Sequence, residues 1–140
     1  MSAATATAPV TALQEGEGAL WESFYCTSQD GLRLHNRLYG SPHAKQLPVV
    51  CLPGLTRTGA DFHEIATALS THRSRPRLVL AMDYRGRGRS DYDPDPGNYD
   101  IRVELQDVQD VMTACGIRHA AFIGTSRGGI ISMGLSVIRP

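Results

Sequence analysis

The sequence predicts an α/β fold whose sheet is mostly parallel and is preceded by an antiparallel hairpin. Three short apolar runs lack the alternation of half-exposed strands; they cover residues 49–52, 78–82 and 120–123. Such runs are typical of parallel strands covered on both faces. Segments with helical spacing separate the runs, and this alternation favours right-handed βαβ crossovers.

The first residues carry little that a core could bury. Residues 2–18 are rich in Ala, Thr, Gly and Glu, which is typical of disordered segments. We therefore expect residues 1–18 to form a disordered extension. The 140 residues suit one domain and not two, so residues 19–140 are assigned to a single unit.

Residues 21–39 have the aromatic and β-branched pattern of strands, and it is interrupted at Gln29, Asp30 and Gly31. An Asp-Gly pair is a strong hairpin signal. Two antiparallel strands are therefore predicted to open the domain.

Two helices are predicted between the apolar runs. In the first, Asp61 is the expected N-cap with Glu64 three residues later, and a buried stripe follows the spacing i, i+3, i+4, i+7. That stripe comprises Phe62, Ile65, Ala66 and Leu69. In the second, Asp100 can cap the start and Gly116 the end. Its apolar positions are Leu105, Val108, Met112 and Cys115.

A third predicted helix, Arg127–Ile138, is apolar on nearly every side, and such a helix is expected to be buried all round. Only two residues follow it, ending at Pro140. We therefore expect a partial fold that lacks C-terminal strands and is poorly stable by itself.

Charge and composition exclude several classes of protein. Lys plus Arg equals Asp plus Glu at 14 each, so no positive surplus attracts nucleic acid or an anionic membrane. The cysteines, Cys26, Cys51 and Cys115, form no CxxC pair, and neither a disulfide framework nor a metal site is predicted. No apolar run approaches the ~18 residues of a membrane span, so a cytoplasmic location is expected.

The sharpest motif is a G-x-S-x-G formed by Gly124, Ser126 and Gly128. It follows a predicted buried strand and precedes a predicted helix, which is the context this motif requires. Such a turn strains the backbone at Ser126 and exposes its hydroxyl above the sheet. The N-terminus of the following helix then offers N–H groups and a positive dipole to a developing oxyanion.

Two further segments complete a resemblance to the α/β-hydrolase family. Residues 52–56 (LPGLT) resemble its oxyanion loop, although Pro53 replaces the usual His, and residues 83–90 (DYRGRGRS) resemble its D-x-R-G-x-G-x-S turn. The resemblance covers about residues 21–140. It implies a Ser126 nucleophile, oxyanion N–H donors at Leu55 and Arg127, elbow glycines at Gly124 and Gly128, and no cofactor. Arg85 and Ser90 are expected to hold loops and not to react.

The implied activity is that of a serine hydrolase acting on a small acyl substrate, a carboxylic ester or lactone, through an acyl-enzyme. In this family the nucleophile is followed along the chain by an acid and a histidine, but no Asp, Glu or His follows Ser126. A serine needs such a base, so the 140-residue chain alone is expected to be inactive.

Several alternatives remain open. The family's carbon-carbon bond hydrolases share the Ser elbow, whereas its dehalogenases and epoxide hydrolases place Asp there. The chain could instead be an inactive fragment that self-associates through an exposed sheet edge at residues 120–123. RNA contact by the arginines of residues 85–89, and metal binding by the acidic loop at residues 91–95, are weaker hypotheses. No nucleotide-binding motif fits at Gly124.

Overall fold

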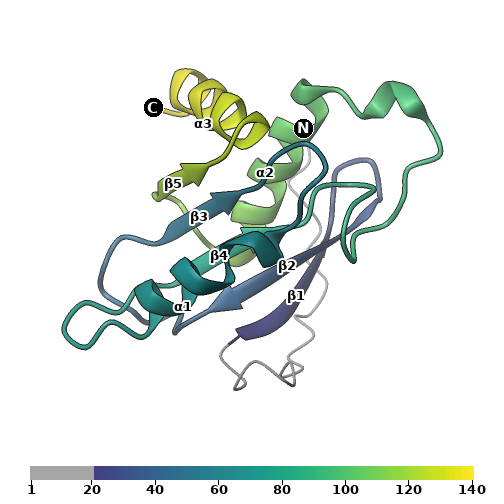
Figure 1. Cartoon of the computed structure of the whole chain (residues 1–140). Helices are drawn as coiled ribbons and strands as arrows, with labels where there is room; N and C mark the ends of the chain where they lie inside the picture. Colours follow the sequence, from purple (N-terminus) through teal and green to yellow (C-terminus); the bar gives the residue numbers. More distant parts are fainter. Residues whose placement is uncertain (1–20) are drawn as a thin grey trace.

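The computed structural model describes residues 21–140, and the extension predicted for residues 1–18 lies outside this part, as does its boundary with the domain (Figure 1). Two strands open the described residues, and strands then alternate with helices from the third strand onward. In order they are β1 (Trp21–Thr27), β2 (Arg33–Tyr39), β3 (Val49–Leu52), the 3₁₀ turn η1 (Gly59–Phe62), α1 (His63–Ser70), β4 (Val79–Met82), the 3₁₀ turn η2 (Pro96–Asn98), α2 (Ile101–Cys115), β5 (Ala121–Gly124) and α3 (Arg127–Ile138).

The strands form one sheet in the order β1-β2-β4-β3-β5, and this confirms the predicted α/β class. The three apolar strands β4, β3 and β5 are parallel to one another. The predicted hairpin is antiparallel and pairs Trp21 with Tyr39 and Thr27 with Arg33. Because β2 also pairs antiparallel with β4, the sheet as a whole is mixed.

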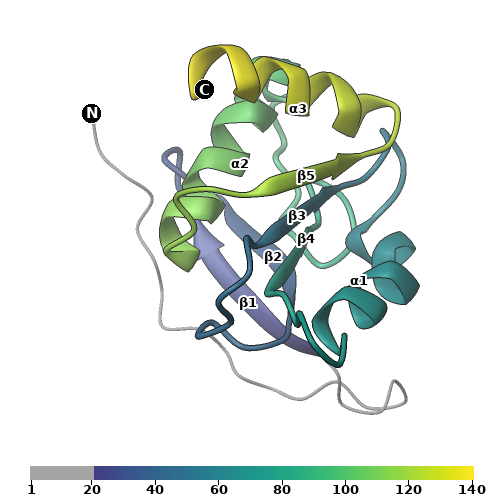
Figure 2. The same ribbon diagram turned by 90° about the vertical axis from the view of Figure 1, so that its left-hand side faces the viewer.

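Helices cover both faces of this sheet (Figure 2). Side chains of the parallel strands alternate between the two cores, since successive residues of a strand point to opposite faces. Val49 and Val79 pack with α1, whereas Val50 and Leu80 pack with α2 and α3. Cys26, Cys51 and Cys115 are all free thiols, and the first two are buried.

The start of α1 differs from the prediction. Thr58, and not Asp61, supplies the capping oxygen, which accepts a hydrogen bond from the Ala60 N–H at the start of η1. Asp61 lies inside that 3₁₀ turn and pairs with Arg57 at 2.7 Å. Ile65 was expected in the buried stripe and is 43% exposed, because the face that packs on the sheet is narrower and centres on Ala66.

The prediction for α2 is confirmed. Asp100 caps it by accepting from the Arg102 N–H, and Gly116 ends it with φ of 72°. The sequence did not predict one feature of α2. Its inward face carries three buried carboxylates beside the apolar side chains. They are Glu104, Asp107 and Asp110.

The apolar composition of α3 calls for burial on every side, but the described residues cover only one face of it, as the shortage of chain after the helix led us to expect. Ile131 and Leu135 are buried, but Val137 is 79% exposed and Met133 63% exposed. The buried face packs on β3, β5 and α2. None of the helices within residues 21–140 has the length and hydropathy needed to cross a membrane.

Candidate active site

Ser126 forms the turn between β5 and α3 and has an unusual backbone conformation. Its φ and ψ are 53° and −112°, and it is the one non-glycine residue with positive φ in the described part of the chain. L-residues avoid positive φ for steric reasons, and such strain concentrates at functional sites. Ser126 is also exposed to solvent.

The two glycines of the motif are required by close backbone contacts. A β-carbon on Gly124 would lie 2.4 Å from the backbone of Gly128. One on Gly128 would lie 2.0 Å from the carbonyl oxygen of Leu52 at the end of β3. Only glycine fits at either position, so this sequence pattern is what allows the sharp strand-to-helix turn.

The N–H groups at the start of α3 are nearly all used inside the turn. Gly128 donates to the Thr125 carbonyl, and Gly129 and Ile130 donate to that of Ser126, over 2.9 to 3.3 Å. Four N–H groups at a helix start lack intrahelical acceptors. Within residues 21–140, the Arg127 N–H is the one of these four groups that donates to no backbone carbonyl.

The loop after β3 lies beside this turn. A β-carbon on Gly54 would be 3.8 Å from the Thr125 carbonyl oxygen and 3.9 Å from the Ser126 β-carbon. The buried hydroxyl of Tyr84 donates to the Pro53 carbonyl at 2.8 Å and so fixes the loop. Leu55, the next residue, is 51% exposed. The structure therefore places the loop that contains Leu55 beside the Ser126 turn, and the role of Leu55 as an oxyanion donor stays a prediction.

Behind both segments lies a charged cluster that sequence reasoning missed. Glu104 of α2 is fully buried, and its two oxygens accept from Arg127 and from Arg87, the latter at 2.7 Å. Arg87 also donates to the Leu55 carbonyl at 2.9 Å. The available signal was the spacing of Glu104, four residues before the buried Val108, which places a carboxylate on the inward face of the helix.

The third motif has structural contacts, in agreement with the expectation for Arg85 and Ser90. Arg85 is fully buried and forms ion pairs with Asp107 at 2.7 Å and with Asp30 and Asp93 at 2.8 Å. The Ser90 hydroxyl donates to the Asp83 carbonyl and accepts from the N–H of His35. Asp93, from the acidic loop at residues 91–95, is therefore engaged by Arg85.

A second serine, Ser23, has the connectivity of a catalytic triad. Its hydroxyl is 2.9 Å from His35 Nε2, and His35 Nδ1 is 2.8 Å from the Asp83 carboxylate. Ser23, His35 and Asp83 are all buried, with exposures of 4%, 1% and 5%, so a substrate cannot reach them. The group instead ties β1 and β2 to the end of β4.

The Asp83 carboxylate is held by further hydrogen bonds. It accepts from the backbone N–H groups of Gly59, at 2.8 Å, and Arg89, at 3.1 Å. Burial alone raises the pKa of Asp83, but the hydrogen bonds from His35, Gly59 and Arg89 outweigh it and hold this pKa below its ordinary value. Asp83 is therefore a structural anion.

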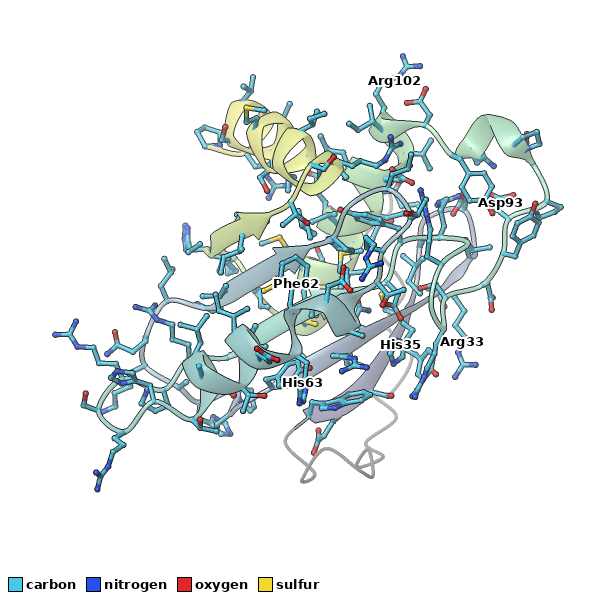
Figure 3. All side chains as sticks on the ribbon, viewed as in Figure 1. Arg33, His35, Phe62, His63, Asp93 and Arg102 are labelled. Carbon is cyan, nitrogen blue, oxygen red and sulfur yellow. The ribbon has the colours of Figure 1, made fainter. Side chains whose placement is uncertain are left out.

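Two histidines on the α1 side of the sheet have partners of their own. His63 Nδ1 is 2.9 Å from the Tyr39 hydroxyl, and His35 belongs to the buried Ser23 group. Both lie well away from α3 (Figure 3). Among the described residues, no hydrogen bond joins the Ser126 side chain to a His, Asp or Glu.

Comparison with known proteins agrees with this architecture. The sequence model of the alpha/beta hydrolase fold family matches residues 48–136, which include the Gly54 loop, the Arg85 turn and the Ser126 turn. The chain belongs to the α/β-hydrolase family.

Individual members of the family support the assignment. A solved α/β hydrolase from Novosphingobium aromaticivorans is 43% identical, with a TM-score of 0.79 over 86% of this chain and 41% of its own. A 3-hydroxybutyrate-oligomer hydrolase from Cupriavidus necator is 36% identical over 79% of this chain. Bifunctional epoxide hydrolase 2 from Sus scrofa is 29% identical over 83% of it. The chain spans 36% and 20% of the lengths of these last two relatives.

Proposed function

We propose that this α/β hydrolase is a serine hydrolase that cleaves a carboxylic ester or lactone, with Ser126 as nucleophile. The observation that carries the proposal is the positive φ of Ser126 at an exposed turn between strand and helix. Strain at such a position is retained when it presents a reactive side chain. The N–H groups of Arg127 and Leu55 on either side would then stabilise the oxyanion.

The reaction follows from these assignments. The Ser126 oxygen bonds to the acyl carbon while a base takes its proton, and the carbonyl oxygen becomes an anion that accepts from the N–H groups of Arg127 and Leu55. The bond from carbon to the alcohol oxygen then breaks, and the alcohol leaves with that proton. Water next attacks the acyl-enzyme, which releases the acid and restores the serine hydroxyl.

The base and its acid partner are proposed to come from polypeptide outside this sequence. All five histidines precede Ser126 in the chain, and His35 and His63 are engaged elsewhere. We expect the 140-residue chain by itself to show no triad catalysis, because an unassisted serine hydroxyl is a poor nucleophile.

An ester is favoured over the other substrates cleaved within this family. The relative from Cupriavidus necator is named for hydrolysis of 3-hydroxybutyrate oligomers, whose monomers are joined by ester bonds. The pig relative is named an epoxide hydrolase, but such members of the family place Asp where this chain has Ser126. A carbon-carbon bond hydrolase remains the alternative within the serine class. Incubation with a ring-cleavage product beside short esters would distinguish the two.

The test is turnover of p-nitrophenyl butyrate by the protein at its natural full length. We expect steady hydrolysis by the wild type, and a rate for Ser126→Ala that is lower by about 10³-fold or more, as for loss of a serine nucleophile. Ser132→Ala is the matched control, since this serine lies further along α3 and its hydroxyl donates to the Gly128 carbonyl. Undiminished hydrolysis by Ser126→Ala would overturn the proposal.

The second candidate is binding without catalysis through the edge of the sheet. It is favoured by the position of β5, which pairs with β3 on one side and ends the strand order. An exposed edge is a template for strand pairing. Concentration-dependent self-association without Ser126-dependent turnover would support this candidate, and Ser126-dependent turnover would exclude it as the whole function.

A further inference from the structure

Glu104 connects the two segments to which the oxyanion donors are assigned. It lies in the first turns of α2 and is fully buried. One of its oxygens accepts from Arg127 Nε and the other from Arg87 Nη1 at 2.7 Å. The partners come from different parts of the chain, 23 residues after and 17 residues before Glu104.

Each arginine is linked directly to one donor. Arg127 bears the first N–H in its own backbone. Arg87 donates through Nε to the carbonyl of Leu55 at 2.9 Å, the residue that bears the second. Hydrogen bonds therefore link the Arg127 side chain of α3 through Glu104 and Arg87 to the loop after β3.

The arginines have little freedom to move. Arg127 and Arg87 side chains are only 20% and 15% exposed, and Arg87 Nη1 also donates to the Arg85 carbonyl at 2.9 Å. The Arg87 guanidinium also lies 5.5 Å from the centre of the Tyr84 ring, and Tyr84 holds Pro53 of the same loop. Buried charge-assisted hydrogen bonds of this kind are short and directional.

We propose that Glu104 is a positioning residue, which holds the N–H groups of Arg127 and Leu55 at the separation that the oxyanion requires. The inference rests on the proposed function of Ser126. An oxyanion hole works when its donors lie 2.7–3.1 Å from the oxyanion, so a shift of either segment weakens the hydrogen bond that its N–H group donates.

A carboxylate is specifically suited to this position. Both oxygens of Glu104 accept, one from each arginine. The amide of Gln can accept at one oxygen only and would turn its NH₂ group toward the other arginine. Glu104→Gln therefore keeps the volume of the side chain but breaks one of the two links.

The experiment measures kcat and KM for p-nitrophenyl butyrate in the full-length protein. Misplacement of catalytic groups by about 1 Å can cost on the order of 10²-fold, and we expect Glu104→Gln to lower kcat by about 10- to 10²-fold with KM within about twofold. Asp110→Asn is the matched control: Asp110 is a buried carboxylate of the same helix, but it accepts from Gln29 and Gln106. Its kcat should equal that of the wild type.

A second measurement separates positioning from a loss of stability. A trifluoromethyl ketone binds serine hydrolases as a tetrahedral oxyanion adduct, so its Ki should rise in Glu104→Gln by the same factor by which kcat/KM falls. If Glu104→Gln fails to fold, Arg87→Met serves instead, since it removes the arginine that joins Glu104 to Leu55 and leaves the pair of Glu104 with Arg127 in place; it should lower kcat by about 10-fold. Wild-type kcat and Ki in either folded variant would refute the inference.

The outcomes also distinguish this inference from the proposed function. If Ser126→Ala abolishes turnover and Glu104→Gln leaves kcat and Ki unchanged, only the role of Glu104 is wrong. If turnover survives Ser126→Ala, the proposed function is wrong and the role of Glu104 falls with it.

Discussion

Gly128 lies against Leu52 so closely that a β-carbon at Gly128 would stand 2.0 Å from the Leu52 carbonyl oxygen. The contact joins the start of α3 to the end of β3, and therefore the turn of Ser126 to the loop that follows β3. Both groups are backbone, so neither can rotate away. This contact fixes the approach of the two segments that we assign to the oxyanion.

Replacing Gly128 by Ala should separate these segments. We expect Gly128→Ala to lower the free energy of unfolding by at least about 1–3 kcal/mol, as for overpacking in a core, and to abolish ester hydrolysis. Gly129→Ala is the matched control, because its β-carbon would meet only the Gly124 carbonyl oxygen at 3.7 Å. That variant should be as stable as the wild type or gain up to about 1 kcal/mol of helix propensity. Urea unfolding gives the free energy of unfolding of both variants, and equal values for the two would contradict this prediction.

The strained backbone at Ser126 predicts a trade-off between stability and activity. Glycine tolerates φ of 53° and alanine does not, so Ser126→Gly should be more stable than Ser126→Ala by about 1–3 kcal/mol. Both variants should be inactive. Differential scanning calorimetry of the pair tests this, and a Ser126→Ala variant as stable as Ser126→Gly would show that the turn carries no strain.

The Arg85 ion pairs should matter more for stability than an exposed pair. Arg85→Met leaves the carboxylate of Asp107 buried without its partner and should cost about 3–5 kcal/mol. Arg102→Met is the control, because the side chain of Arg102 is 88% exposed beside Asp100, and its Tm should match that of the wild type. Figure 3 shows Arg102 at the start of α2. Similar losses of Tm in both variants would contradict the structural role of Arg85.

Asp30 should contribute to acid sensitivity. The hydrogen bond from Arg85 is the main reason why the pKa of Asp30 falls from its ordinary 3.8 to about 2. Because the folded pKa is below the unfolded one, this stabilisation is present above about pH 4 and is lost as the pH falls toward 2. Asp30→Asn should therefore be less stable at pH 5, and should lose less stability than the wild type between pH 5 and pH 2.5. Urea midpoints at the two pH values measure this, and identical losses would argue against it.

Much of the fold could be predicted from local patterns. The apolar runs at β3 and β4 are buried at every position, as predicted, and Asp100 and Gly116 cap the start and the end of α2. The prediction of a buried strand was wrong for β5, which is exposed at Ala121 and half-buried at its other residues, because it lies at the edge of the sheet.

The predicted start of α1 was wrong because a 3₁₀ turn precedes the helix, and Thr58, which caps that turn, lies six residues before Glu64. Such a turn depends on the contact of Gly59 with the Ala81 carbonyl, which no local pattern reveals.

Part of the candidate site could also be predicted from local sequence, and part could not. Ser126 lies two residues from each of Gly124 and Gly128, and this spacing, between a predicted strand and a predicted helix, predicts a strained turn. Glu104 could not be assigned from the sequence, since its two partners are distant in the chain and meet only after α2 packs against α3. The Ser23 group was missed for the same reason, because His35 and Asp83 are 48 residues apart.

Covalent labelling of the full-length protein with a fluorophosphonate tests the central claim most directly. Such a probe reacts with a serine that is both nucleophilic and accessible, and peptide mass spectrometry locates the adduct. We predict an adduct on Ser126 that is absent in Ser126→Ala and unchanged in Ser23→Ala. An adduct on another residue, or labelling that persists in Ser126→Ala, would contradict it.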